Sequence, residues 1–158
     1  MKKIDYTTYK KPTDFMKFEQ GDNLIRIVSS GVIGLQHVMK TANRFVNLGP
    51  CTEDETCEFC NKGYEPKAAW KWLVFNYADK TIKILDAGIM IGNQICELGK
   101  KFGDPQEFDI VVNKKGESLK TQYVCTKVVK DTGIPEDLKA GLEFRKKRLI
   151  NKFFTKKQ

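Results

Sequence analysis

Hydrophobic and polar residues alternate in several short segments of the chain, and a period of two residues is typical of strands. In residues 22–28, Leu24 and Arg26 fall on one face, and Ile25 and Ile27 fall on the other. This segment is therefore expected to be the first strand of the fold. Further extended segments are predicted at residues 36–45, 81–85, 108–112 and 119–129.

The clearest alternation lies in residues 70–77, which we expect to form a strand paired with residues 81–85 across a short turn. Side chains on a strand point alternately to its two faces. Leu73, Phe75 and Tyr77 therefore share one apolar face, whereas both tryptophans of the chain lie on the other. That second face carries Trp70, Trp72 and Val74.

Two segments have the three- and four-residue spacing of an amphipathic helix. The first is residues 89–102, in which isoleucine and leucine recur on one face before Gly103 ends the pattern. The second begins at Pro135 and runs toward Phe154 as a basic helix. Its apolar positions, in rough helical register, are Leu138, Leu142, Leu149 and Phe153.

The one histidine of the chain and three of its five cysteines form a metal-ligand pattern. His37, Cys51, Cys57 and Cys60 have the spacing His-x13-Cys-x5-Cys-x2-Cys. Thiolates and imidazole are the ligands that structural Zn2+ prefers, and a C-x-x-C pair lets two thiolates reach one ion. Because four protein ligands leave no position for an activated water, we expect one structural zinc per chain.

A redox-active C-x-x-C pair is the rival interpretation of Cys57 and Cys60, and unrelated thiols are the plain alternative. The redox interpretation predicts a strand-to-helix setting without a third cysteine nearby. Here an acidic loop, residues 52–56, and another cysteine precede the pair. Cys96 and Cys125 have apolar neighbours and are expected to be small buried hydrophobes. The odd cysteine count indicates a reducing, cytosolic compartment.

The net charge of +8 lies mainly in the two ends of the chain. Residues 1–20 have a net charge of +2, and residues 139–158 have a net charge of +7. Residues 21–138 are close to neutral, at −1, and the acids of the zinc loop lie largely between Glu53 and Glu58. No apolar run approaches the ~20 residues of a membrane-spanning helix. A basic stripe near the metal ligands is therefore compatible with a nearly neutral domain, and a mixed solvated surface is the alternative.

The order of the predicted elements favours a mainly β protein. Three strands, a helix and two strands suit a five-stranded barrel of OB type, with the helix between strands three and four. The zinc-binding loop would be an insertion between strands one and two. The predicted organisation is a basic N-terminal arm at residues 1–17, an OB-fold domain at 18–130 with a zinc subdomain at 37–66, and a basic C-terminal helix and tail at 131–158.

Aromatic and basic residues are interleaved near the zinc loop. Single-stranded nucleic acid is held by rings that stack on bases and by cations that neutralise phosphates. Trp70 and Trp72 flank Lys71, and a place in the core is the alternative for each tryptophan. No nucleophile–base set or phosphate-cradling loop is evident, so we do not expect an enzyme. The predicted stacking residues are Phe45, Tyr64, Trp70 and Trp72, and the predicted phosphate contacts are Lys40, Arg44, Lys67, Lys71 and Lys83.

The chain resembles the bacteriophage single-stranded DNA-binding proteins that have a zinc-containing OB fold, the family of the T4-type helix-destabilising protein. The similarity covers about residues 18–130. It departs from the family at the C-terminal end, which is basic here where the family has an acidic tail, and in the N-terminal arm. The matching parts are residues 18–28, His37, Cys51, residues 57–60, residues 70–79 and residues 102–110.

The resemblance implies that single-stranded DNA lies between the barrel and the zinc subdomain, bound without strong sequence preference. Coating of open strands would destabilise duplex DNA during replication, recombination and repair in the cytoplasm of an infected bacterial host. Replication and recombination proteins are the expected partners, and Leu142, Leu149 and Phe153 offer a surface for self-association. A zinc-ribbon adaptor that contacts a polymerase and an RNA-binding regulatory protein remain as alternatives.

Overall fold

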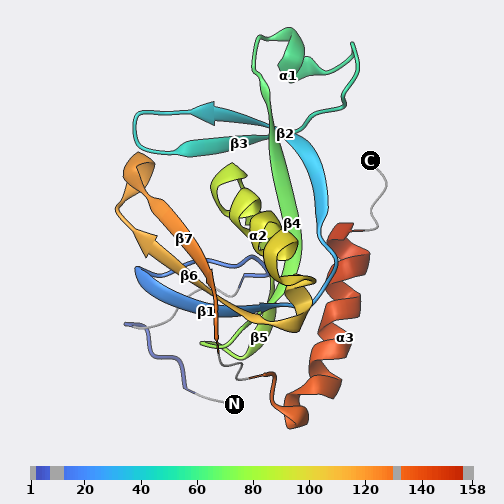
Figure 1. The fold of residues 1–158 in the computed structure, drawn as a ribbon. Helices are drawn as coiled ribbons and strands as arrows, with labels where there is room; N and C mark the ends of the chain where they lie inside the picture. The colour runs from blue at the N-terminus through green and yellow to red at the C-terminus, as the bar shows by residue number, and fades with distance from the viewer. Residues whose placement is uncertain (1–2, 8–12, 130–132, 155–158) are drawn as a thin grey trace.

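A computed structural model describes residues 3–7, 13–129 and 133–154 (Figure 1). Within these ranges, seven strands form one antiparallel sheet accompanied by three α-helices. The strands are β1 (Gly21–Ile27), β2 (Val32–Lys40), β3 (Phe45–Pro50), β4 (Pro66–Asn76), β5 (Thr81–Ala87), β6 (Asp109–Lys115) and β7 (Gln122–Lys127). The helices are α1 (Glu58–Asn61), α2 (Ile89–Phe102) and α3 (Lys139–Leu149), with 3-10 turns at Pro105–Glu107, Ser118–Lys120 and Glu136–Leu138 and a π-helical turn at Ile150–Phe154.

The mainly β fold is confirmed, and so are the first strand and the amphipathic helix α2. The segment 36–45, predicted as one extended piece, is different: it contains the end of β2, a turn, and the start of β3. The backbone N–H of Thr41 donates to the carbonyl of Arg44 at 2.8 Å, and the Thr41 hydroxyl donates to the same oxygen. This short turn reverses the chain and makes β2 and β3 a hairpin.

Strand β4 organises the sheet because it is long enough to pair with three other strands. One of its edges pairs with β5 from Trp70 to Asn76. The other edge pairs with β2 near the start of β4 and with β1 near its end. Between these two pairings, the Ser29 hydroxyl accepts a hydrogen bond from the Leu73 N–H at 2.8 Å. The β2–β3 hairpin and α1 thereby extend beyond the rest of the sheet, at the top of Figure 1.

The prediction of a closed five-stranded barrel is wrong. The described strands form an open sheet in the order β3-β2-β4-β1-β6-β7, with β5 on the free edge of β4. A closed barrel would need β5 to pair with β7, but α2 lies between these two strands and contacts both, as well as β4. The Gln94 side chain donates to the Tyr123 carbonyl and accepts from the Cys125 N–H, both at 2.8 Å. A glutamine amide thus satisfies backbone groups that another strand would otherwise pair.

Both faces of β4 are buried from Trp72 to Phe75. On one face, Trp72 and Val74 pack with Ile91 and Ile95 of α2. On the other face, Leu73 and Phe75 pack with α3. The apolar positions predicted for the C-terminal helix all join this second cluster. They are Leu138, Leu142, Leu149 and Phe153.

This packing corrects the prediction of self-association through Leu142, Leu149 and Phe153. Leu149 has no exposed surface, and the other two pack in the same cluster. These side chains therefore belong to the protein's own core. The rest of the predicted basic tail, residues 155–158, lies outside the described residues. None of the helices in the described ranges is long and apolar enough to cross a membrane.

The contact between α2 and β4 leads to a testable prediction about Gly92. A Cβ added there would lie 2.3 Å from Cε3 of Trp70, which is closer than atoms can pack. We expect Gly92→Ala to lower the free energy of unfolding by about 1–3 kcal/mol, because the tryptophan or the helix must move.

Gly99→Ala in the same helix is the matched control. Its Cβ would meet Pro105 at an ordinary 3.5 Å. Alanine reduces the entropy of the unfolded chain, so this variant should gain about 0.4–1 kcal/mol. Urea unfolding of both proteins measures the difference. Equal stability of the two variants would contradict the close packing of Trp70 on α2.

Candidate metal centre and basic face

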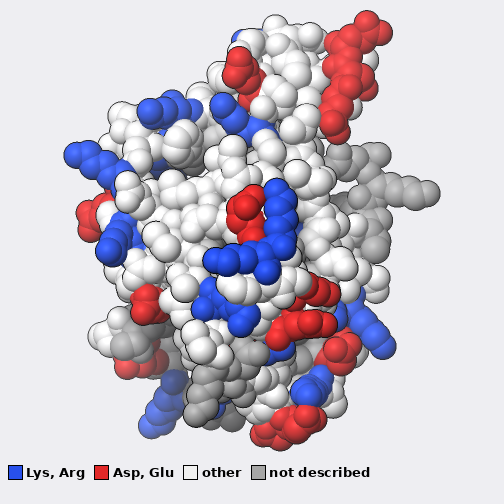
Figure 2. All heavy atoms as spheres, in the orientation of Figure 1, with Lys and Arg blue, Asp and Glu red and all other residues white. Residues whose placement is uncertain are grey.

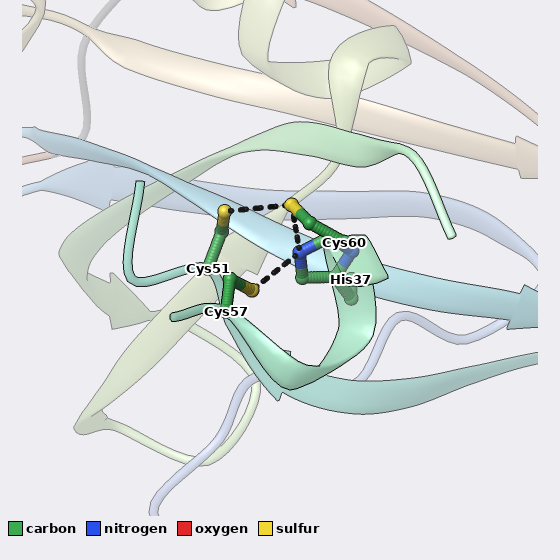
Figure 3. A group of neighbouring side chains, drawn as sticks. All are labelled: His37, Cys51, Cys57 and Cys60. Carbon is green, nitrogen blue, oxygen red and sulfur yellow. Dashed lines mark hydrogen bonds between the residues drawn. The ribbon is translucent and has the colours of Figure 1, made fainter. Parts of the chain in front are cut away.

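Four side chains from three parts of the chain meet above the sheet (Figure 3). His37 comes from β2, Cys51 follows β3, and Cys57 and Cys60 lie at the start and within the single turn of α1. Because β2 and β3 pair directly, His37 lies opposite Gly49, two residues before Cys51. The hairpin therefore brings the first two ligands of the predicted set together, and α1 brings the other two.

The donor atoms have the spacing expected of ligands around one tetrahedral ion. His37 Nε2 lies 3.3 Å from Cys57 Sγ and 3.4 Å from Cys60 Sγ. The Sγ atoms of Cys51 and Cys60 are 3.6 Å apart, and all four donors lie within 4.8 Å of one another. A tetrahedron with metal–sulfur bonds of ~2.3 Å has sulfur–sulfur edges of about 3.8 Å. The predicted ligand set is thus confirmed as a candidate metal site.

Electrostatics at the cluster also suit a cation. Backbone N–H groups of Cys60 and Thr52 lower the pKa of the Cys57 thiol to about 6, so a thiolate forms there at neutral pH. Desolvation and the adjacent Cys51 and Cys57 sulfur atoms raise the pKa of Cys60 to about 12. Several thiolates this close together repel one another, and a divalent cation between them removes that repulsion.

The loop that carries the ligands is ordered by its own hydrogen bonds. Asp54 accepts from the N–H and hydroxyl of Thr56 and from the hydroxyl of Thr52. The N–H of Cys51 donates to the Leu35 carbonyl at 2.9 Å, which ties the loop to β2. The Phe59 ring packs 5.5 Å from the imidazole of His37. The site is therefore supported around the ligands as well as by them.

A metal site fits this cluster better than a redox pair does. All three cysteines are free thiols, and Cys51 is as near to Cys60 as the histidine is. His37 has no exposed surface, and within the described structure its Nδ1 has no hydrogen-bond partner. A fully buried imidazole whose Nε2 points at sulfur atoms is expected when that nitrogen binds a metal.

The structure corrects the predicted role of Trp72. Its side chain is 6% exposed and packs in the core against α2, and the backbone at Gly31 lies directly against the indole. Trp70 is partly buried against α2 at Gly92. The alternation in β4 had suggested that the Leu73 face is buried and that the tryptophan face is exposed. Both faces are covered at this point of the sheet, because α2 packs on Trp72 and α3 packs on Leu73.

Two other predicted nucleic-acid contacts, Lys83 and Tyr64, already contact other groups of the protein. The Lys83 ammonium donates to the Thr13 carbonyl and lies 3.9 Å from the Asp79 carboxylate. Its side chain is only 14% exposed. Tyr64 follows α1 in the metal module, by which we mean the β2–β3 hairpin, the loop after it and α1. Its hydroxyl contacts the sulfur of Met39 at 3.8 Å. Neither side chain faces the same way as the remaining predicted residues.

The remaining predicted residues come together through the strand register. Lys40 lies opposite Phe45. Alternate positions along β2 lead from Lys40 through Val38 to Gln36, across a register shift of the β2–β3 pair between His37 and Val38, and Gln36 lies opposite Lys67. Lys71 follows on the same face of β4. His37 points to the opposite face, toward the metal cluster. We call the exposed side the basic face, formed by Gln36, Lys40, Phe45, Asn47, Lys67 and Lys71, with Gly34 and Ala69 between them.

The basic face is open and has few bulky side chains. Phe45 is 62% exposed, although a phenylalanine is usually buried. Arg44 lies exposed in the turn at the end of the face. Asn47 donates to Gln36 at 3.0 Å, which shows that these two amides lie on one side. The sequence-based prediction missed both amides, although Gln36 precedes His37 on β2 and Asn47 lies two residues after Phe45 on β3.

Charged side chains are distributed unevenly around the metal module (Figure 2). Acidic residues gather at the upper right of the view, over the loop before α1, and basic residues gather at the left, around the tip of the β2–β3 hairpin. The acids of the loop are exposed. They are Glu53, Asp54, Glu55 and Glu58.

Comparisons with protein-family models, curated proteins and solved structures find no match to this chain.

Proposed function

We propose that this protein binds and coats single-stranded DNA through the basic face, without strong sequence preference. The observation that carries the proposal is the exposed ring of Phe45 directly opposite Lys40, on the face that also carries Lys67 and Lys71. A flat ring can stack on any base, and the cations can follow the phosphates of a flexible strand. Stacking of this kind is worth ~1–3 kcal/mol per base.

The face suits a single strand better than a duplex. Gly34 and Ala69 keep the middle of the surface low, so a backbone can approach the lysines on either side. Stacking on Phe45 requires an unpaired base, which a duplex does not present. Binding only to open strands would shift the melting equilibrium toward them by mass action. The role is stoichiometric, and it suits replication, recombination and repair, in which single strands are exposed.

We propose further that the candidate metal site holds one structural Zn2+. His37 Nε2 and the sulfur atoms of Cys51, Cys57 and Cys60 are the donors, and a Cys3His set is one that zinc prefers. A zinc ion there would hold the hairpin and the loop together. Because His37 faces the cluster, its neighbours Gln36 and Lys40 on β2 face away from it, toward the basic face.

Replacement of Phe45 tests the binding surface. Phe45→Ala should weaken binding of a fluorescent dT oligomer by roughly five- to a hundredfold, because one stacked base is lost. Titrations with rU oligomers and with a duplex establish whether RNA or paired DNA binds instead. Removal of an exposed ring should leave the stability of the fold almost unchanged.

Phe144→Ala is the matched control for this experiment. Phe144 is 75% exposed and lies on α3, and it is not one of the residues that form the basic face. We expect this variant to bind dT oligomers as the wild type does. An equal loss of dT affinity in the two variants, or wild-type affinity in Phe45→Ala, would contradict the assignment of the basic face. Binding of rU alone would favour the RNA-binding alternative.

A further inference from the structure

A cavity of about 570 Å³ opens where β5 and β7 fail to pair. Its floor is formed by Leu85 of β5 and Ile91 of α2, both parts of the apolar core. One wall is aromatic, because the rings of Phe18 and Tyr123 are in contact, with centroids 5.8 Å apart. The volume lies within the range of ~300–1,000 Å³ that is usual for small-ligand sites.

The wall of this seam cavity, named for its place between β5 and β7, is held by hydrogen bonds to the backbone of residues 16–19. The Met16 N–H donates to the Ile84 carbonyl at 2.7 Å, which fastens one end of the segment 16–19 to β5. At the other end, Glu19 exchanges two hydrogen bonds of 2.9 Å with the side chain of Asn23. The Lys114 ammonium donates to the Phe18 carbonyl at 3.2 Å.

The polar rim indicates which group can enter. Lys17 and Lys114 contribute two positive charges, and Glu19 and Asp86 contribute two negative ones. A rim without net charge does not favour an anion over other groups. An aromatic wall, an apolar floor and polar groups at the edge suit a flat, uncharged ring with hydrogen-bonding edges. A nucleobase has this chemistry.

The seam cavity approaches the basic face at one pair of residues on β4 and β5. Lys71 of that face pairs in register with Asp86, which lies on the cavity rim. Burial raises the pKa of Asp86, and the nearby charge of Lys71 opposes that effect. Leu85 of the cavity floor pairs with Trp72 and so points to the opposite face of the sheet. A strand whose phosphates follow Lys67 and Lys71 would therefore pass around the edge of β5 at Asp86 to reach the cavity.

We propose that the seam cavity receives one unstacked base of the bound single strand, packed against Tyr123 and Phe18. This inference rests on the proposed function and adds a second contact point to it. The phosphates stay outside, on the lysines of the basic face. Two separated base contacts joined by phosphate contacts would hold a flexible strand in one path across the molecule.

Ultraviolet crosslinking of the intact protein to a dT oligomer, followed by peptide mass spectrometry, tests the proposal. We expect crosslinks at Tyr123 or Phe18 in addition to Phe45. Tyr123→Leu, which retains an apolar side chain, should bind the oligomer at least about fivefold more weakly. Tyr6→Leu is the matched control, since Tyr6 is 87% exposed and outside the cavity, and it should bind like the wild type.

The possible outcomes separate this inference from the proposed function. Crosslinks confined to the basic face, with the wild-type protein binding dT, would overturn the cavity assignment and leave the proposed function standing. Failure of the wild-type protein to bind dT would overturn both. The crosslinking result decides the matter if Tyr123→Leu proves unstable in thermal unfolding, because it uses the unmodified chain.

Discussion

Cys57→Ser is expected to abolish stoichiometric metal binding and to loosen the chain from β2 to the start of β4. Cys57 is 1% exposed, and its sulfur lies 3.3 Å from His37 Nε2, at the centre of the donor set. Binding free energies of structural zinc in small modules are ~10–16 kcal/mol, and this energy is also folding energy. Elemental analysis should give well under one metal ion per chain. Hydrogen exchange should show lost protection in residues 36–66.

The rest of the protein should remain folded in this variant. Neither of the two apolar clusters includes a residue between 36 and 66, so the cores on both faces of β4 do not depend on the metal. Cys96→Ser is the matched control, because Cys96 lies on α2, outside the donor set. It should retain about one ion per chain. A full complement of metal in Cys57→Ser would rule out the four-residue site.

Leu149→Ala should lower the free energy of unfolding by about 2–5 kcal/mol, the usual cost of truncating a buried leucine. Leu149 has no exposed surface and packs with Leu73, Phe75, Ile82 and Ile84. For a domain of this size, the loss corresponds to a melting temperature lower by roughly 5–15 °C. Differential scanning calorimetry measures it directly.

Phe144→Ala, in the same helix, provides the comparison for Leu149→Ala. Because Phe144 is 75% exposed, its truncation should change the stability by no more than about 0.5 kcal/mol. A small effect of both substitutions would mean that α3 is not part of the core. The expected large difference would establish α3 as part of the core, so removal of residues 139–158 would disrupt the fold.

The docking of α3 is reinforced by charge as well as by apolar contact. Asp14 lies 3.4 Å from Arg145, 3.6 Å from Arg148 and 3.3 Å from Lys152. The same N-terminal segment pairs with β5 through the bridge between Phe15 and Ile84. Part of the positive charge of the C-terminal segment therefore serves the fold and is not free to bind a ligand. The basic face depends instead on lysines carried by β2 and β4.

The sequence by itself determined the metal-ligand set, because donor chemistry and short spacing are local properties. His37 and the three cysteines could be assigned from their residue types and separation, and the structure places their donor atoms together. Helix α2 and the alternation in β4 were likewise readable, since both depend on the periodicity of neighbouring residues. The second strand was predicted at residues 36–45, but the hairpin that separates β2 from β3 was missed, because a turn at residues 41–44 has no glycine or proline to mark it.

Only the tertiary structure decided which of the alternating faces remain exposed. Periodicity separates Trp72 from Leu73, but it does not show that α2 covers one and α3 the other, because those helices come from distant parts of the chain. Closure of the sheet is also non-local: α2 and Gln94 occupy the edge where a barrel would have closed. The basic face likewise exists only through the pairing of β2 with β3 and β4, which places Phe45 opposite Lys40 and Lys67 opposite Gln36 on one face.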